Sequence, residues 1–373
     1  MLPDKLQALL GMRHFSGSLR KLTVNKGLVD FASNDYLGFS KLAPSATYSS
    51  NGATGSRLLS GHSELHDEVE AQIAQFHNAP AALLFNSGYD ANIGLIPALT
   101  DRADLILFDQ LVHASIRDGI QLSQAKSLKY RHNDLDHLEI LLSKFSEEEE
   151  REVYVITESV FSMDGDMPDL KKLIALVKRF ENAHLILDEA HALGVIGKNG
   201  AGLAQKLDVE NDIFARVMTF GKALGCHGAA ILGSEDLKEY LINYARSFIY
   251  TTALPEHSLR SIAYGYRTLS QREGTLSQLT QNITLFNKLV LQNGLRLRFR
   301  ESETAIQVCI IPKNDKVKKT ASVLKENGYD VRAILSPTVH QGEERLRVCL
   351  HSFNTEKEIE GMLKLLAKTL KNL

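Results

Sequence analysis

Lys222 is the residue whose surroundings most directly suggest chemistry. It follows the apolar segment Val217 to Phe220 and lies between the small residues Gly221 and Ala223. A lysine held among apolar groups costs free energy unless its charge is removed or used. A Schiff base with the aldehyde of a cofactor does both, and it leaves the amine available later as a proton carrier. A surface lysine can also follow a strand by chance, so this interpretation depends on the residues that accompany it.

Asp188 and His191 support the interpretation of Lys222. They stand at the end of the apolar segment Ala183 to Leu187, with the histidine three residues after the carboxylate. Pyridoxal phosphate needs an acid beside its ring nitrogen, because a carboxylate keeps the pyridinium protonated and able to accept electrons. Asp188 suits that role, and His191 could hydrogen-bond the phenolic oxygen of the ring. The string Asp-Glu-Ala-His also occurs in helicases, but the chain lacks the Gly-x-x-x-x-Gly-Lys-[Ser/Thr] loop that holds a triphosphate.

Two further places in the chain could hold the phosphate and the ring of such a cofactor. An apolar segment ending at Phe85 leads through serine and glycine into a predicted helix. Helix N-termini present free amides and a positive dipole end, so the backbone of Gly88 and Tyr89 is a candidate phosphate cradle. His113 follows the next apolar segment, and its flat ring could stack on a flat cofactor. Turns and caps of the same kind are often purely structural, so neither assignment stands alone.

No metal site is predicted. His62, His66 and His77 have spacings that suggest one side of a helix, but no cysteine or carboxylate arrangement around them makes a persuasive metal site. The three cysteines are odd in number and far apart, which fits neither a disulfide framework nor a zinc cluster. A reducing cytoplasm is the simplest setting.

The candidate residues stand where short apolar segments end. Six such segments alternate with helical patterns, at residues 81–85, 105–108, 153–157, 185–187, 217–220 and 229–232. This alternation predicts an α/β fold with a mostly parallel central sheet. Open α/β sheets bind ligands at the carboxyl ends of their strands. We therefore expect Gly88, His113, Asp188 and Lys222 to meet at one edge of that sheet.

The pattern divides the chain into three parts. We expect an N-terminal arm of residues 1–45, a large cofactor-binding domain of residues 46–255 and a smaller C-terminal α/β domain of residues 256–373. The smaller domain is expected to begin with helices through about residue 294, followed by strands at 306–311 and 346–350 and a last helix from Thr355. A chain of 373 residues is long enough for two lobes with their own cores. The arm is expected to pack on the smaller lobe.

The composition excludes several classes of partner. Lysine and arginine total 43 against 45 aspartates and glutamates, and the formal net charge of -2 gives no electrostatic case for nucleic acid or an anionic membrane. The apolar runs are strand-sized, well short of the ~20 residues that a membrane helix needs. The N-terminus offers no unbroken hydrophobic region of secretory length. We expect a cytoplasmic protein with small-molecule partners.

Taken together, these sequences resemble the α-oxoamine synthase family of fold-type I pyridoxal-phosphate enzymes. The match extends over most of the chain, and its landmarks run in the family's order. They are Ser33-Asn34-Asp35-Tyr36-Leu37-Gly38, Gly55-Ser56-Arg57-Leu58-Leu59-Ser60-Gly61, Ser87-Gly88-Tyr89, Asp109 with His113, Glu158 with Phe161-Ser162-Met163-Asp164-Gly165, Asp188 with His191, Thr219 with Lys222, Tyr250-Thr251-Thr252, and Pro337-Thr338-Val339.

The resemblance implies a role for each matching residue. Lys222 would bind the cofactor's aldehyde, Asp188 would pair with the ring nitrogen, and His113 would stack on the ring and help to activate the thioester. Family members are homodimers with the site at the subunit interface, where Thr251 or Thr252 would reach the partner's phosphate. The other residues assigned to the cofactor are Gly88, Tyr89, Ser162, His191 and Thr219, and those assigned to the substrate are Arg20, Asn34 and Thr338.

The resemblance also implies the reaction, in which an amino acid and an acyl thioester are joined with loss of carbon dioxide. The nearest match within the family uses L-alanine and a pimeloyl thioester, carried by coenzyme A or by a carrier protein. A sister enzyme that uses glycine or serine with another acyl thioester remains open, although the string from Gly55 to Gly61 favours alanine. A non-catalytic homologue would be expected to lack Lys222, which is present.

One position departs from the family's pattern. Members commonly carry an arginine shortly before the Pro-Thr pair, suited to gripping a carboxylate in two-pronged fashion. In this chain that position is Leu335. Either Arg332, Arg345 or Arg347 takes over this role, or the amino-acid carboxylate is held differently.

Overall fold

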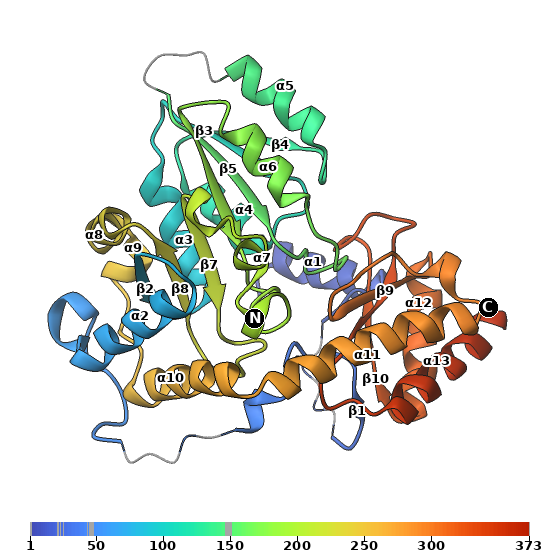
Figure 1. Cartoon of the computed structure of the whole chain (residues 1–373). Helices are drawn as coiled ribbons and strands as arrows, with labels where there is room; N and C mark the ends of the chain where they lie inside the picture. Colours follow the sequence, from blue (N-terminus) through green and yellow to red (C-terminus); the bar gives the residue numbers. More distant parts are fainter. Residues whose placement is uncertain are drawn as a thin grey trace.

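The computed structural model describes residues 2–372, except 21, 23, 25, 43, 45–47 and 146–150. Its largest element is a seven-stranded sheet in the order β2-β8-β7-β6-β5-β3-β4 (Figure 1). The neighbouring strands β7, β6, β5, β3 and β4 are parallel to one another. β8 runs antiparallel to both of its neighbours, β2 and β7. The mostly parallel sheet is therefore confirmed. The strands are β2 (Ala81–Phe85), β3 (Leu105–Asp109), β4 (Lys126–Tyr130), β5 (Val153–Glu158), β6 (Ala183–Asp188), β7 (Ala215–Thr219) and β8 (Ala229–Gly233).

Apart from β4, the sheet is buried on both faces. Successive side chains of a strand point to opposite faces, and each face packs into its own hydrophobic cluster. In β2, Leu84 packs into one hydrophobic cluster, while Leu83 and Phe85 pack into another. One cluster lies under α3, α4, α8 and α9, and the other under α2, α5, α6, α7 and α10. These helices are α2 (Glu64–Phe76), α3 (Gly88–Leu99), α4 (Ala114–Leu122), α5 (Leu135–Phe145), α6 (Leu170–Val177), α7 (Leu203–Lys206), α8 (Glu235–Tyr244), α9 (Arg246–Ile249) and α10 (Glu256–Gln271).

β4 is the strand of this sheet that the sequence did not predict. It lies at the edge, paired only with β3, and most of its residues are exposed or half-buried. Its sequence, Lys126-Ser127-Leu128-Lys129-Tyr130, therefore lacks the apolar run that marks the other strands.

A smaller unit follows in the C-terminal part of the chain. Its antiparallel sheet has the order β11-β12-β9, and α11, α12 and α13 pack with it. α10 and α11 run end to end along one side of the molecule, with α10 packed on α2 of the large unit and α11 on α13 (Figure 1). The elements are α11 (Glu273–Gln292), β9 (Ile306–Ile310), α12 (Asn314–Glu326), β11 (Arg332–Ile334), β12 (Arg345–Cys349) and α13 (Glu356–Lys371).

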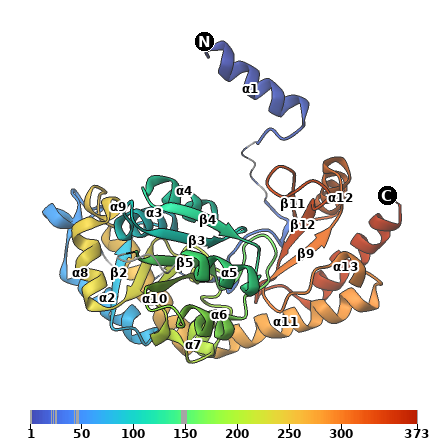
Figure 2. The ribbon, with the colours of Figure 1, turned by 90° about the horizontal axis from the view of Figure 1, so that it is seen from above.

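The N-terminal segment packs on the rest of the chain only in part. β1 (Val29–Asp30) pairs with β10 (Tyr329–Asp330) of the smaller unit, and the following residues enter the core at Phe31 and Tyr36. In contrast, α1 (Asp4–Phe15) has no buried residue and projects away from the rest of the chain (Figure 2). Thus the expected arm packs on the smaller unit at residues 29–31, whereas α1 has no buried residue.

No helix in the described part of the chain is long and apolar enough to cross a membrane.

Candidate active site

The carboxyl ends of β5, β6 and β7 place three polar residues side by side. Glu158 ends β5 and pairs in register with Asp188, which ends β6, and Thr219 ends the next strand, β7. Lys222 follows β7 in a closed loop, in which the Phe220 nitrogen donates to the Gly228 oxygen at 3.0 Å. The parallel register therefore brings together residues that lie more than sixty positions apart in the sequence.

Asp188 is a buried carboxylate held by two amide donors. Asn92 Nδ2 donates to Asp188 Oδ2 at 2.9 Å, and the Ala190 main-chain nitrogen donates to Asp188 Oδ1 at 2.9 Å. The same Asn92 amide nitrogen lies 3.0 Å from Ser115 Oγ. Asn92 thus joins the carboxylate at the end of β6 to the first turn of α4, and it fixes the direction in which Asp188 presents its oxygens.

His113 is the N-cap of α4, as one structural alternative had predicted. The Ser115 main-chain nitrogen donates to His113 Nδ1 at 3.2 Å, and the His113 main-chain nitrogen donates to Glu158 Oε1 at 2.5 Å. Because Nδ1 accepts a hydrogen bond, the neutral ring carries its proton on Nε2. Burial lowers the pKa of His113, so the ring is neutral at physiological pH.

Lys222 has an unusually low pKa for a lysine. Burial lowers the pKa of Lys222 to about 8, although the charges of Asp188 and Glu158 act in the opposite direction. Burial also raises the pKa of Glu158, and the neighbouring charge of Asp188 adds to the effect. At pH 7 roughly a tenth of an amine with this pKa is neutral, a far larger fraction than for an ordinary lysine, and the neutral form is the one that attacks an aldehyde.

The predicted phosphate cradle lies at the N-terminus of α3. The helix is capped by Ser87, whose Oγ accepts from the Asp90 main-chain nitrogen at 3.1 Å, and it begins with Gly88. A Cβ atom on Gly88 would meet Thr219 Oγ1 at 2.3 Å, so only glycine allows α3 and β7 to approach this closely. The free amides of Gly88 and Tyr89 thus begin a helix beside a threonine hydroxyl.

Thr251 and Thr252 lie beside this cradle in the same chain. Asn86, which directly follows β2, donates from Nδ2 to the Thr252 oxygen at 2.8 Å and to Thr251 Oγ1 at 3.2 Å. Tyr89, the second residue of α3, has a half-exposed side chain, and its hydroxyl donates to Asp118. The structure therefore holds both threonines against Asn86, two residues before Gly88, and their reach to the partner's phosphate stays a prediction.

His191 is buried and bonded to a tyrosine from the N-terminal segment. Tyr36 Oη and His191 Nδ1 are 2.7 Å apart, and Tyr36 is completely buried. Burial, followed by the charge of Lys222, lowers the pKa of His191 well below its ordinary value. The ring is neutral, and its Nε2 is free to meet a ligand.

Arg347 joins three parts of the site. Its Nε donates to the Ser162 oxygen at 2.7 Å, its Nη2 to Asn34 Oδ1 at 3.0 Å, and its Nη1 to Cys349 Sγ at 2.9 Å. Among the described residues no carboxylate forms an ion pair with Arg347, although its side chain is buried. A buried guanidinium without an acid beside it is costly unless an anionic ligand completes the site.

The other two arginines that could replace the expected residue at Leu335 are already engaged. Arg345 is buried and forms ion pairs with Asp164 and Glu343. Arg332 is exposed and pairs with Asp330. Of the three, Arg347 alone keeps its charge unmatched among the described residues.

Two predicted substrate residues lie on the surface. Thr338 is exposed in the turn between β11 and β12, where its main-chain nitrogen donates to the Leu335 oxygen at 2.9 Å. Arg20 is exposed on the segment between α1 and β1. In the described part of the chain, no hydrogen bond or ion pair joins Arg20 to the residues above.

Three residues of the site were given no role from sequence: Asn92, Ser115 and Tyr36. Asn92 lies one helical turn beyond Gly88 and is buried, so a polar side chain on the inner face of a short helix was the available signal. Tyr36 gave no such signal, because its partner His191 is 155 positions away.

The residues fit pyridoxal phosphate. An amine with a depressed pKa, a carboxylate, a neutral flat ring and a capped helix N-terminus follow the carboxyl ends of β7, β6, β3 and β2 at one edge of the sheet. These are the groups that such a cofactor needs at its aldehyde, its ring nitrogen, its ring face and its phosphate.

Comparison with known proteins agrees with the assignment of a pyridoxal-phosphate site. The family model described as aminotransferase class I and II matches residues 26–366. An 8-amino-7-oxononanoate synthase of Emericella nidulans is 40% identical over 405 residues, which cover 100% of this chain and 97% of that protein. A protein of Haemophilus influenzae named as a putative 8-amino-7-oxononanoate synthase is 41% identical, covering 90% of each chain.

Solved structures are similar over nearly the whole chain. A serine palmitoyltransferase of S. paucimobilis with a bound PLP–myriocin aldimine has a TM-score of 0.89 and 25% identity, covering 99% of this chain and 97% of that one. The 8-amino-7-oxononanoate synthase of Francisella tularensis has a TM-score of 0.78 and 31% identity, covering 93% of this chain and 99% of that one.

Proposed function

The chain belongs to the aminotransferase class I and II family and is a pyridoxal-phosphate enzyme of the acyltransferase type, and on that premise we propose that it condenses L-alanine with a pimeloyl thioester. The products are 8-amino-7-oxononanoate, carbon dioxide and the free thiol of coenzyme A or of a carrier protein. This reaction would place the enzyme in biotin biosynthesis.

The observation that carries the proposal is the position of an unmatched buried cation near the reactive amine. Arg347 and Tyr36 both donate to Asn34 Oδ1, and Tyr36 Oη lies 2.7 Å from His191 Nδ1, so the guanidinium stands on the His191 side of the site. The charge of Arg347 also lowers the pKa of Lys222. An α-amino acid offers an amine and a carboxylate to the same site. Lys222 marks where the amine exchanges, and Arg347 offers the donors for the carboxylate.

The residues of the chain have separate tasks in this reaction. When bound, pyridoxal phosphate supplies a sink for electrons released at the α-carbon of the amino acid. Asp188, oriented by Asn92, would hold the ring nitrogen in its protonated form, and His191 would form a hydrogen bond with the ring oxygen. Lys222, once free of the cofactor's aldehyde, takes the α-proton at Nζ, because its pKa of about 8 suits a general base near neutrality.

Carbon–carbon bond formation then follows. The α-carbon of alanine bonds to the thioester carbonyl carbon, the carbon–sulfur bond breaks, and the thiol leaves. The original carboxyl group departs as carbon dioxide, and a proton replaces it on the carbon. We propose that His113 Nε2–H donates to the thioester oxygen, since its Nδ1 is already occupied by Ser115.

A second candidate comes from the structural neighbours. Serine palmitoyltransferases fit this chain with the higher TM-score, although their sequence identity is lower than that of the 8-amino-7-oxononanoate synthases. The same cofactor groups would then serve serine and a long-chain thioester. The identity of 40% over the whole chain supports alanine and pimeloyl as the first choice.

We also propose a cytoplasmic homodimer, and we keep the division into an arm (1–45), a large domain (46–255) and a small domain (256–373). The dimer is supported by α1, whose apolar side chains Leu6, Leu9, Leu10 and Phe15 are exposed on a helix that contacts little of its own chain (Figure 2). A second copy would cover that surface and complete the site beside Thr251.

The test presents alanine, glycine and serine separately, each with pimeloyl and palmitoyl thioesters of coenzyme A and of a carrier protein. Thiol release and carbon dioxide are measured for each pair. We expect the highest kcat/KM with alanine and a pimeloyl thioester. A preference for serine with palmitoyl would establish the second candidate, and no thiol release with any pair would reject the synthase assignment.

A further inference from the structure

His132, two residues after the end of β4, lies between two carboxylates. Its Nδ1 is 2.9 Å from Asp109 Oδ1, and its Nε2 is 2.7 Å from Asp166 Oδ2. Asp109 is completely buried, and the His132 side chain is 18% exposed. Both ring nitrogens therefore face acceptors, an arrangement that requires both to carry protons. We name these three residues the Asp109–His132–Asp166 bridge.

One end of the bridge holds the turn that carries His113. Asp109 ends β3, its Oδ1 accepts from the Leu111 main-chain nitrogen at 2.8 Å, and its main-chain oxygen accepts from Val112 at 3.1 Å. His113 is the next residue in the chain. The direction of the Asp109 carboxylate thus fixes the path from the strand to the stacking histidine.

The other end holds the loop that carries Ser162. The Phe161 main-chain nitrogen donates to the Asp166 oxygen at 3.0 Å, which closes the 161–166 loop, and the Phe161 ring packs edge-on against His132 with centroids 4.4 Å apart. Ser162 follows Phe161, and its oxygen accepts from Arg347 at 2.7 Å.

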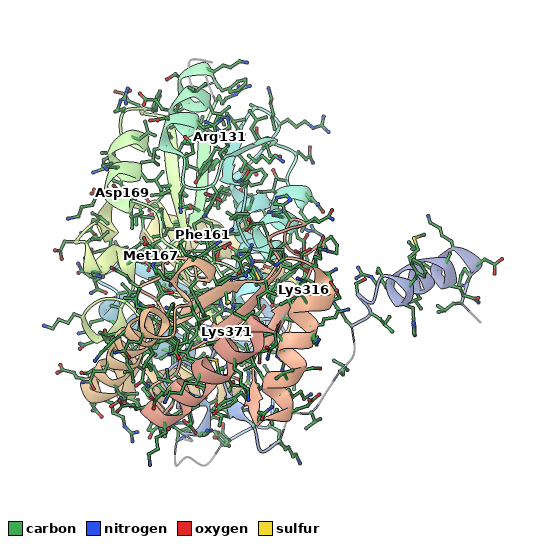
Figure 3. The ribbon with its side chains drawn as sticks, turned by 90° about the vertical axis from the view of Figure 1, so that its right-hand side faces the viewer. Arg131, Phe161, Met167, Asp169, Lys316 and Lys371 are labelled. Carbon is green, nitrogen blue, oxygen red and sulfur yellow. The ribbon has the colours of Figure 1, made fainter. Side chains whose placement is uncertain are left out.

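The 161–166 loop also contacts the smaller unit. Ser302 Oγ donates to the Gly165 oxygen at 2.9 Å, and Arg345 pairs with Asp164. Figure 3 shows Phe161 between the part of the ribbon that carries α5 and α6 and the C-terminal part. A shift of this loop would move Ser162 and Arg347 together.

We propose that His132 is a positioning residue, whose charged ring bridges Asp109 and Asp166 and so fixes the positions of His113 and Ser162 relative to each other. The proposal rests on the proposed function, because it assumes that these two residues contact pyridoxal phosphate. No direct contact of His132 with cofactor or substrate is required.

The charge that this role requires is stable over the physiological range. Burial alone would lower the pKa of His132, but its hydrogen bonds to Asp109 and Asp166, with the attraction of their charges, raise the pKa of His132 to about 10. The bridge thus stays intact at neutral pH. A neutral side chain at this position would leave the buried Asp109 charge without its cation.

The test compares His132→Gln and Asp166→Asn with the control His184→Gln. His184 also pairs with a carboxylate, with Nε2 2.6 Å from Glu152 Oε2, but it lies at the amino end of β6, opposite the site. For each holoenzyme we would measure the dissociation constant of pyridoxal phosphate, the circular dichroism of the bound cofactor, the KM for the amino acid and the melting temperature.

We expect His132→Gln to weaken cofactor binding about tenfold, as for one lost charge-assisted hydrogen bond, and to reduce the cofactor's dichroic band. Asp166→Asn should have a similar effect, and the double variant should be no worse than His132→Gln alone, because the bridge acts as a unit. His184→Gln should change neither the dissociation constant nor the band.

The proposal is overturned if His132→Gln lowers only the melting temperature and leaves cofactor binding, the dichroic band and KM as in the wild type. It is equally overturned if His184→Gln produces the same losses. Should His132→Gln fail to fold, Asp166→Asn carries the test under the same criteria. Cofactor binding needs no acyl donor, so failure of the wild type to release thiol would reject the proposed reaction without touching the bridge.

Discussion

Replacement of Arg347 tests the most specific feature of the site. A guanidinium has five N–H donors, and three of those of Arg347 are used by Ser162, Asn34 and Cys349. Two donors, one on each terminal nitrogen, therefore remain for a ligand. Arg347→Met removes them together with the charge while keeping most of the apolar stem.

The size of the effect follows from those two donors. A hydrogen bond to a charged group contributes about 1.5–3 kcal/mol, so two of them contribute about 3 kcal/mol at the lower end. At about 1.4 kcal/mol for each factor of ten, the loss corresponds to a rise in KM for the amino acid of about 150-fold. Arg347→Lys keeps the charge but loses the two-pronged hydrogen bonding of the guanidinium. Its KM for the amino acid should lie between those of the wild type and Arg347→Met.

The assay is thiol release at saturating acyl thioester with the amino acid varied. Arg332→Met is the matched control, since Arg332 is exposed and pairs with Asp330 outside the site. We expect that control to keep the wild-type KM. If Arg347→Met binds the amino acid as well as the wild type does, or if Arg332→Met shows the larger loss, the assignment of the carboxylate to Arg347 is wrong.

Four further predictions concern the cofactor. Lys222→Ala should abolish the visible absorption band of the holoenzyme; an unchanged band would reject Lys222 as the residue that binds the aldehyde. In the wild-type apoprotein the rate of pyridoxal-phosphate uptake should rise with pH and level off above about 8, because only the neutral amine of Lys222 attacks the aldehyde. A rate that keeps rising to about pH 10, as for an ordinary lysine, would contradict the lowered pKa. Gly88→Ala should weaken cofactor binding at least about tenfold, because the new Cβ would meet Thr219 Oγ1 at 2.3 Å. Fluorescence titration measures this affinity, and an unchanged affinity would show that α3 can move away from β7. Asn92→Leu should reduce the melting temperature and the cofactor affinity together, because Asp188 loses a hydrogen bond worth about 1.5–3 kcal/mol; a loss in only one of the two would argue against Asn92 as the support of Asp188.

The sheet was predictable because most of its strands are buried on both faces. Each of the six apolar segments became a strand within a few residues of the expected bounds, and the helix expected from Thr355 begins with that residue as its cap. β4 escaped because an edge strand with exposed lysines carries no apolar run. The sequence also did not show that α1 projects away from the smaller unit, because a helical pattern does not state what the helix packs against.

Within the site, local sequence was enough for residues whose role depends on a strand end or a helix start. Gly88, Asp188 and Lys222 were found in this way, and the structure places all three at the same edge of the sheet. Their grouping followed from the rule that parallel strands share a carboxyl end. The roles assigned to them remain predictions that the variants above test.

The sequence by itself determined the α/β pattern, the strand ends and the presence of a reactive lysine near a carboxylate. Tertiary structure alone decided which arginine is left without an acid, because Arg332, Arg345 and Arg347 have the same chemistry and differ only in their neighbours. It also decided which buried polar groups support the site, such as Tyr36 on His191 across 155 residues. Burial and ion pairing are properties of the packed chain, and no local spacing encodes them.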